Sequence, residues 1–262
     1  EASRAHLETV PLNNFEAIEG VFECMGGDIA AVVIEAIMGN CGSIASSPAY
    51  LQRLRELCDA HGALLIIDEV KTGFRVAPGG AQELYGIHAD LTTYAKAMGN
   101  GYPVAAFGGR AEVMDVISFG KKGVTHGGTY TANMVALSAA KATLTLLKET
   151  DAYATINRTG AAFQALLSRV FTKHGVTHRF AGPDSMFGIH FGEIVPSNYR
   201  DWKQTDSELY TEFAMNLIKH GVMLEPDSRE PWFICEAHQQ VDLAWLERVA
   251  DSALGEAIAA RG

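Results

Sequence analysis

Two apolar segments that each end in a chemically reactive side chain constrain this 262-residue chain more than any other feature. The first is Leu64–Ile67, which is followed by Asp68, and the second is 89–95, which is followed by Lys96. A continuous apolar run bounded by turn residues is typical of a strand buried on both faces. In an open parallel sheet, ligands bind beyond the carboxyl ends of the strands. The sequence therefore predicts an α/β fold with a site between this acid and this lysine.

A strand–helix–strand unit leads into this site. We expect strands over 28–38 and 63–70, with a helix over 48–62 between them that begins at Ser47-Pro48 and ends at Gly62. Two strands joined in this way form a right-handed parallel crossover. Further elements of the first half are helices over 12–25, 82–85, 111–117 and 131–149, strands over 89–95 and 104–107, and a Gly-rich loop over 118–130.

The remainder of the chain has a different pattern of elements. It predicts helices over 151–174, 206–221 and 241–261, an antiparallel hairpin over 179–192, and strands over 222–225 and 232–235. Helices on a small antiparallel sheet make an α+β unit. We therefore expect a larger domain over 1–150, including a linking helix, and a small C-terminal domain over 151–262.

Charge and cysteine content exclude several kinds of partner. The net charge is −10 and basic residues are not clustered, so we expect no nucleic acid and no membrane partner. The four cysteines have neither CxxC nor His-paired spacing, which argues against a disulfide or a metal site. Reduced thiols and the lack of a leader or a membrane-length apolar run favour a cytoplasmic protein.

The two reactive side chains suit one type of cofactor chemistry. A carboxylate at the end of a buried strand is costly unless it has a cationic partner. A lysine in an apolar, Gly-bounded turn can serve as a nucleophile or a base. In pyridoxal-phosphate enzymes a lysine forms the Schiff base and an acid keeps the pyridinium nitrogen protonated, which are roles open to Lys96 and Asp68.

Two other readings of the same residues explain less. Gly99-Asn100-Gly101 begins a dinucleotide-binding GxG, but Val104 stands where the third glycine is required. A Schiff-base lyase without pyridoxal phosphate would use Lys96 but would leave Asp68 unexplained.

Three segments carry a resemblance to a known family: IIDEVKTGFR, ADLTTYAKAMGNGYPVAAFGG and THGGTYTAN. They resemble the core of the class III, fold-type-I pyridoxal-phosphate enzymes, and are most similar to the branch around glutamate-1-semialdehyde 2,1-aminomutase and its transaminase relatives. The resemblance runs from about Asp28 to the C-terminus. It implies a large domain with a mostly parallel sheet and an α+β small domain. It also implies that the family's N-terminal portion, with the loop that holds the cofactor phosphate, is absent here.

The resemblance assigns cofactor contacts to particular residues. It implies that Lys96 forms the Schiff base, that Asp68 binds the pyridinium nitrogen, and that Val70 packs on the cofactor ring. Thr129, beside Gly128, matches a threonine that reaches the cofactor phosphate of the neighbouring subunit, which implies a homodimer with a shared active site. In addition, Asn40 matches an asparagine near the ring hydroxyl.

Four further residues are placed by their positions near the site. Glu230 resembles a glutamate at the active-site entrance, and Arg229 is a candidate for binding a substrate carboxylate. Glu69, on the strand face opposite Asp68, is expected to form a structural ion pair, and Glu35 a structural contact.

Three functions remain open from the sequence. The first is a pyridoxal-phosphate-dependent aminotransferase that moves an amino group between an amino acid or amine and a keto or aldehyde acceptor. The second is an aminomutase that transfers the amino group within one substrate. The third is a non-catalytic or incomplete polypeptide that lacks the phosphate loop.

Overall fold

A computed structural model describes residues 6–117 and 123–262. Its largest sheet has the strand order β1-β4-β5-β6, formed by Ala31–Ile34, Leu64–Asp68, Leu91–Tyr94 and Ala106–Gly109. Strands β1, β4 and β5 are parallel, and β6 runs antiparallel to β5. The expected mostly parallel sheet is therefore confirmed, and Asp68 is the last residue of β4.

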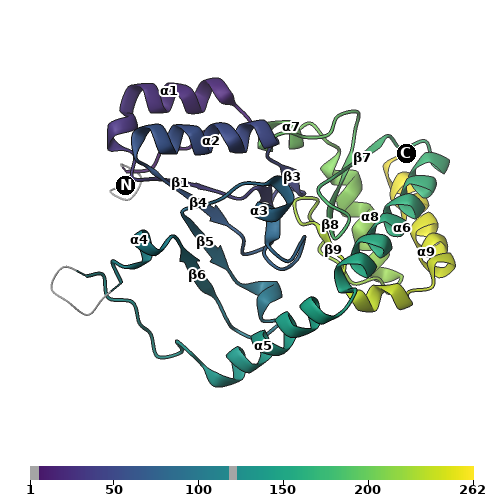
Figure 1. Cartoon of the computed structure of the whole chain (residues 1–262). Coiled ribbons are helices and arrows are strands. Elements are labelled where there is room, and N and C mark those ends of the chain that lie inside the picture. Colours follow the sequence, from purple (N-terminus) through teal and green to yellow (C-terminus); the bar gives the residue numbers. More distant parts are fainter. Residues whose placement is uncertain (1–5, 118–122) are drawn as a thin grey trace.

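The crossover from β1 to β4 runs through helix α2, which spans Pro48–His61. The Ser47 hydroxyl accepts a hydrogen bond from the Tyr50 N–H, and Gly62 ends the helix with a left-handed φ of 72°. Helix α1, Phe15–Met25, lies beside α2 on the same side of the sheet (Figure 1). The core between these helices and the sheet includes Ile18, Phe22, Leu51, Leu54, Leu65 and Ile67.

Two boundaries in this region differ from the expected ones. The predicted strand over 28–38 is broken, because β1 ends at Ile34 and Ile37–Met38 forms β2, which pairs with β3, Ile44–Ala45, in a separate antiparallel ribbon. At the break, the Glu35 carboxylate accepts a hydrogen bond from the Gly39 N–H at 2.9 Å. Helix α1 begins three residues later than predicted, because the Asn14 side chain caps it.

Short elements follow β4 and lead to a long helix. Helix α3 spans Gly80–Tyr85, the 3-10 turn η3 spans Lys96–Met98, and α4 spans Ala111–Met114. Helix α5, Met134–Glu149, starts where Asn133 caps it and runs along the lower edge of the molecule to α6 (Figure 1). The predicted loop over 118–130 lies partly outside the described residues, since 118–122 are not described.

The C-terminal part is a second layer of helices on a small antiparallel sheet. Its sheet has the order β7-β8-β9, formed by His178–Ala181, Met186–Phe191 and Trp232–Phe233, which confirms the predicted hairpin. Around it lie α6 (Ala152–Lys173), α7 (Tyr199–Trp202), α8 (Ser207–Lys219), η4 (Glu236–Gln240) and α9 (Leu243–Arg261). Every residue of β8 is buried. The surrounding core includes Phe163, Leu167, Phe171, Phe213, Ala250 and Leu254.

The predicted strand over 222–225 is wrong. This segment is irregular in the structure, and Met223 is 97% exposed. Among the described residues it pairs with no neighbouring strand, and a strand needs a partner for its backbone N–H and C=O groups. None of the described helices is long and apolar enough to cross a bilayer.

The two layers meet at a close backbone contact. The turn between β2 and β3 packs on β8, where the Ser43 hydroxyl donates to Met186 O at 2.9 Å and His190 Nε2 donates to Gly42 O at 2.9 Å. A Cβ atom on Gly188 would lie 1.9 Å from Gly42 O, so only glycine fits there. This contact fixes the position of the turn that carries Asn40.

Candidate active site

Asp68 is held by the strand next to its own. Its Oδ1 accepts hydrogen bonds from the Val70 N–H at 2.8 Å and from the Thr93 hydroxyl at 3.0 Å. Thr93 lies opposite Asp68 in the parallel register of β4 and β5. Oδ2 has no hydrogen-bond partner among the described residues. One carboxylate oxygen is thus anchored, and the other is available to a ligand.

Lys96 occupies an unusual backbone conformation directly after β5. Its φ is 42°, in the left-handed region that residues other than glycine rarely adopt. The turn is closed by Gly99 N–H and Asn100 N–H, which both donate to Lys96 O at 3.0 Å. The side chain is exposed and has no hydrogen bond or ion pair with another described residue. Backbone strain at a reactive residue is typical of functional sites.

Glu35 brings a second carboxyl group to the same edge of the sheet. Ile34 of β1 pairs with Ile67 of β4, so Glu35 and Asp68 follow at neighbouring strand ends. Burial raises the pKa of the Glu35 carboxyl, and the negative charge of Asp68 adds to this. The Gly39 N–H and the positive charges of Lys71 and Lys96 act in the opposite direction. These charge effects indicate that Asp68, Lys71 and Lys96 all lie near Glu35.

Lys71 joins two of the predicted site residues across the two layers. Its Nζ donates to Gly39 O at 2.6 Å, to Asn40 Oδ1 at 2.7 Å and to Glu230 Oε2 at 2.8 Å. The backbone adds another link, because Gly42 N–H donates to Arg229 O at 2.6 Å. The structure therefore brings Asn40, Arg229 and Glu230 together.

The Arg229 guanidinium is engaged by its own loop. Its Nε lies 3.0 Å and 2.9 Å from the two carboxylate oxygens of Asp227, and the group stacks over the Trp202 ring at 5.8 Å. The hydrogen bonds to Asp227 raise the pKa of Arg229, and Arg229 lowers the pKa of Asp227. In this arrangement a substrate carboxylate would share Arg229 with Asp227.

The other predicted cofactor contacts, Val70, Gly128 and Thr129, lie on two separate segments of the chain. Val70 is half-buried in the turn after β4, where its N–H orients Asp68. Gly128 and Thr129 lie in the exposed loop before α5, where Gly128 O accepts a hydrogen bond from Thr131 N–H at 3.0 Å. Within the described ranges, no hydrogen bond joins this loop to Asp68 or Lys96.

The predicted ion pair of Glu69 is wrong. Glu69 is fully buried, and its carboxylate accepts hydrogen bonds from the Thr72 hydroxyl and from Ala81 N–H and Gln82 N–H, the latter two at 2.9 Å. These backbone donors belong to the first turn of α3, so Glu69 caps that helix. The unsatisfied N–H groups of the helix take the place of a cation.

Sequence reasoning missed Lys71 and Thr93 as site residues. Thr93 lies three residues before Lys96 on a predicted neighbouring strand, so a parallel register could have identified it. Lys71 lies three residues after Asp68, but its contact with Glu230 spans 159 positions and has no local sequence pattern.

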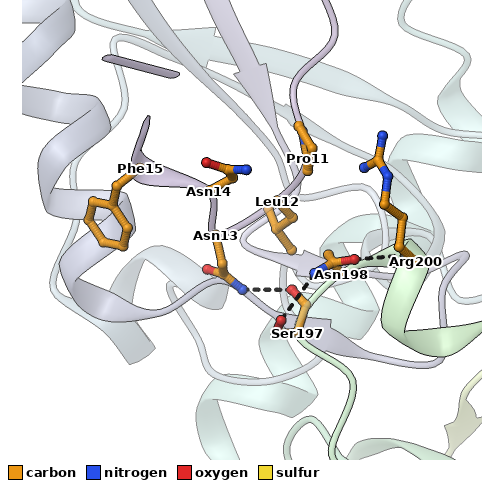
Figure 2. Close-up of a pocket in the computed structure, with 8 residues that line it drawn as sticks. All are labelled: Pro11, Leu12, Asn13, Asn14, Phe15, Ser197, Asn198 and Arg200. Carbon is orange, nitrogen blue, oxygen red and sulfur yellow. Dashed lines mark hydrogen bonds between the residues drawn. The ribbon is translucent and has the colours of Figure 1, made fainter. Parts of the chain in front are cut away.

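The hollow drawn in Figure 2 lies elsewhere. It is lined by Pro11–Phe15 with Ser197, Asn198 and Arg200, and Asn13 Nδ2 donates to Ser197 O at 2.8 Å across it. It contains none of the predicted site residues. In the described part of the chain, no group of three or more His, Cys, Asp or Glu residues could hold a metal ion. We therefore place the candidate site at the strand ends with Asp68 and Lys96.

The sheet order, the acid and lysine at neighbouring strand ends, and the α+β C-terminal layer define an α/β fold of the fold-type-I aminotransferase class. Comparison with known proteins identifies the family. The chain belongs to the aminotransferase class-III family, whose family model matches residues 3–243.

Individual relatives agree with this assignment. The chain is 40% identical over 243 residues to a glutamate-1-semialdehyde 2,1-aminomutase 2 of Brevibacillus brevis, covering 93% of this chain and 56% of that protein. Its structure is similar to that of an omega-transaminase from Sphaerobacter thermophilus, with a TM-score of 0.83 and 30% sequence identity. The match covers 97% of this chain and 57% of that protein. It is also similar to the FumI protein of Sphingopyxis sp. MTA144 in its PLP internal aldimine form, with a TM-score of 0.85 and 27% sequence identity. The match covers 98% of this chain and 59% of that protein. The chain thus spans a little over half the length of the relatives it matches.

Proposed function

We propose that this chain is the cofactor-ring-binding and C-terminal part of a pyridoxal-phosphate-dependent aminotransferase. The enzyme would move an amino group between an amino acid or amine and a keto or aldehyde acceptor. The observation that carries the proposal is the pair of strand ends, where Asp68 is anchored through one oxygen and the Lys96 amine binds no other residue that the structure describes. Membership of the class-III family supports it.

The described residues fit the cofactor. Bound pyridoxal 5'-phosphate supplies an electron sink for breaking a bond at the amino-bearing carbon. Asp68 Oδ2 is free to accept a hydrogen bond from a protonated ring nitrogen, and Lys96 Nζ is free to attach to the cofactor aldehyde carbon. We assign Val70 to the ring face, Asn40 to the ring hydroxyl, and Gly128 with Thr129 to the phosphate.

Each of the two central residues has a defined chemical task. The Asp68 carboxylate would bind the protonated ring nitrogen and so favour the form of the ring that carries this proton. Lys96 Nζ would hold the cofactor through its aldehyde carbon. When free, the same amine would take a proton from the amino-bearing carbon of the substrate as a general base and give it back as a general acid. The acceptor half runs the same proton steps in reverse.

Substrate contacts and assembly complete the proposal. Glu230 lies at the mouth of the site, and Arg229 is the candidate for a substrate carboxylate. We infer a homodimer in which Thr129 serves the partner's site, because helix α5 and the preceding loop expose the apolar residues Tyr130, Met134, Val135, Leu137 and Leu146. Sedimentation would test it, since a monomer at micromolar concentration contradicts it.

The proposal also includes the division into two domains and the location of the protein in the cell. Two separate hydrophobic cores, one centred on α2 and β4 and one on α6, β8 and α9, support domains over 1–150 and 151–262. The four free cysteines, of which Cys24 and Cys235 are exposed, support a reducing, cytoplasmic location.

An aminomutase is the second candidate. Eight relatives that are 36–41% identical to this chain carry the name glutamate-1-semialdehyde 2,1-aminomutase. In that reaction the donor and the acceptor positions are in one molecule, so turnover needs no added keto acid.

One spectroscopic experiment separates these functions. The chain is loaded with pyridoxal 5'-phosphate. The amino donor β-phenylalanine, after which a structurally similar aminotransferase of Variovorax paradoxus is named, is added and followed by a keto acid, and this is compared with glutamate-1-semialdehyde alone. An aminotransferase loses its visible band with the amine and regains it with the keto acid, whereas an aminomutase turns over the semialdehyde without an acceptor. Lys96→Ala is the inactive control. A chain that retains no cofactor contradicts both and favours the non-catalytic reading.

A further inference from the structure

All three N–H donors of the Lys71 ammonium group form hydrogen bonds with the loops that border the site. An ammonium has three N–H donors and no acceptor. Here they go to Gly39 O, Asn40 Oδ1 and Glu230 Oε2, at 2.6, 2.7 and 2.8 Å. The side chain is only 9% exposed. A group so fully engaged holds its partners in place and has no donor left for a ligand.

Gly39, in the turn that follows β2, leaves room for the Lys71 side chain because it has no side chain of its own. A Cβ atom on Gly39 would lie 2.1 Å from Lys71 Cδ, so the aliphatic part of Lys71 occupies the place of a side chain there. The ammonium also lies 5.7 Å from the centre of the Phe233 ring. Lys71 is therefore packed between the two layers of the molecule and is fixed at both ends.

The contact with Lys71 determines how Asn40 faces the site. An ammonium can only donate, so the Asn40 side chain must turn its oxygen towards Lys71. The two N–H donors of the amide then point away from Lys71. Asn40 is exposed, so these donors are available to a bound molecule.

Glu230 is oriented by the same contact. Its side chain is 33% exposed, and one carboxylate oxygen is paired with Lys71. The other oxygen has no hydrogen-bond partner within the described ranges. Glu230 thus presents a charge-paired carboxylate, and its loop is further tied to the turn by Gly42 N–H and Arg229 O at 2.6 Å.

We propose that Lys71 is a positioning residue that presents the amide N–H donors of Asn40 and a charge-paired Glu230 to the molecule bound in the site. The inference rests on the proposed function, which assigns Asn40 to the hydroxyl of the cofactor ring. Lys71 acts through Asn40 and Glu230 and touches neither cofactor nor substrate.

The expected effect concerns the ionised form of that ring hydroxyl. With Lys71→Met, the Asn40 amide is free to rotate and the negative charge of Glu230 is unpaired, while Glu35, Asp68 and Lys96 remain around the site. Both changes disfavour an anionic oxygen. The pH midpoint of the visible band should therefore rise by about one pH unit, the size of one net hydrogen bond.

The experiment compares four variants of the chain loaded with pyridoxal 5'-phosphate. Lys71→Met and Asn40→Leu should both raise the pH midpoint of the band, and Lys71→Arg should raise it less than Lys71→Met. The matched control is Lys219→Met, which removes an exposed lysine of α8 and should leave the midpoint unchanged. Asn40→Leu keeps the Lys71–Glu230 pair, so it tests the inference even where Lys71→Met folds poorly.

A second measurement does not need the cofactor. Thermal unfolding of the unloaded chain with Lys71→Met, Glu230→Gln and the double variant should show non-additive losses, because each single change breaks the same pair. Midpoints in Lys71→Met and Asn40→Leu equal to that of Lys219→Met would overturn the positioning role alone. Additive unfolding losses would overturn the pairing. A wild-type chain that stays colourless contradicts the proposed function and this inference with it.

Discussion

The Thr93 hydroxyl donates a hydrogen bond to Asp68 Oδ1 at 3.0 Å, between residues that lie opposite each other in the parallel pairing of β4 and β5. The orientation of the carboxylate is therefore set by the sheet itself. A strand is a more rigid support than a loop for a group that must hold a charge in place. The Val70 N–H holds the same oxygen at 2.8 Å, so Oδ2 is the oxygen left for a ligand.

Replacement of Thr93 by valine keeps the shape of the side chain and removes the donor. We expect Thr93→Val to weaken binding of pyridoxal 5'-phosphate by about tenfold, because a hydrogen bond to a charged group is lost. Titration of the visible absorbance measures this. Thr172→Val, at an exposed position of α6, is the control. Equal affinities for the two variants would show that Thr93 does not orient Asp68.

The raised pKa of Glu35 predicts a pH-dependent stability effect. A carboxyl whose pKa is higher in the folded state than the ordinary value of 4.5 favours folding when protonated, and this contribution is lost as the pH rises through the folded pKa. Glu35→Gln keeps an oxygen for the Gly39 N–H but cannot ionise. The variant should therefore be more stable than the wild type at about pH 7, with the gain disappearing below 4.5.

Urea unfolding at both pH values measures the Glu35 effect. Glu236→Gln, at an exposed position, should change the free energy of unfolding at neither pH. A Glu35→Gln variant that is less stable than the wild type at about pH 7 would show that the ionised carboxylate is stabilising, against the direction argued here.

Glu69 is expected to matter for folding more than for chemistry. Glu69→Leu leaves the buried N–H groups of Ala81 and Gln82 without acceptors, which should lower the free energy of unfolding by about 3 kcal/mol. Glu69→Gln retains one acceptor oxygen and should cost about 1 kcal/mol. Urea denaturation of the unloaded chain distinguishes them, and a loss of similar size in both would point to the negative charge as the stabilising feature.

Local sequence features predicted the parts of the fold that depend on local interactions. Ser47-Pro48 and Gly62 mark both ends of α2, and the apolar run before Asp68 marks β4. The segment 222–225 has strand-like composition but finds no partner, and partner strands are chosen by tertiary packing. The break after Ile34 likewise depends on the hydrogen bond between Glu35 and Gly39.

The same distinction holds for the site. Asp68 and Lys96 were predicted as site residues from the apolar segments that they follow and, above all, from the resemblance of the surrounding motifs to the family. Lys71 and Thr93 act through partners that are far away in the sequence, so only the register and the meeting of the two layers reveal them. The prediction of an ion pair for Glu69 was wrong because backbone N–H groups at the N-terminus of a helix bind its carboxylate instead.

The most direct test of the account is reduction of the chain with borohydride after loading with pyridoxal 5'-phosphate, followed by peptide mapping. We expect a visible band that disappears on reduction and a pyridoxyl mass on the peptide that contains Lys96, with no such mass in Lys96→Ala. A pyridoxyl mass on Lys71 or on another lysine, or a chain that remains colourless, would contradict the assignment of Lys96 as the residue that attaches the cofactor.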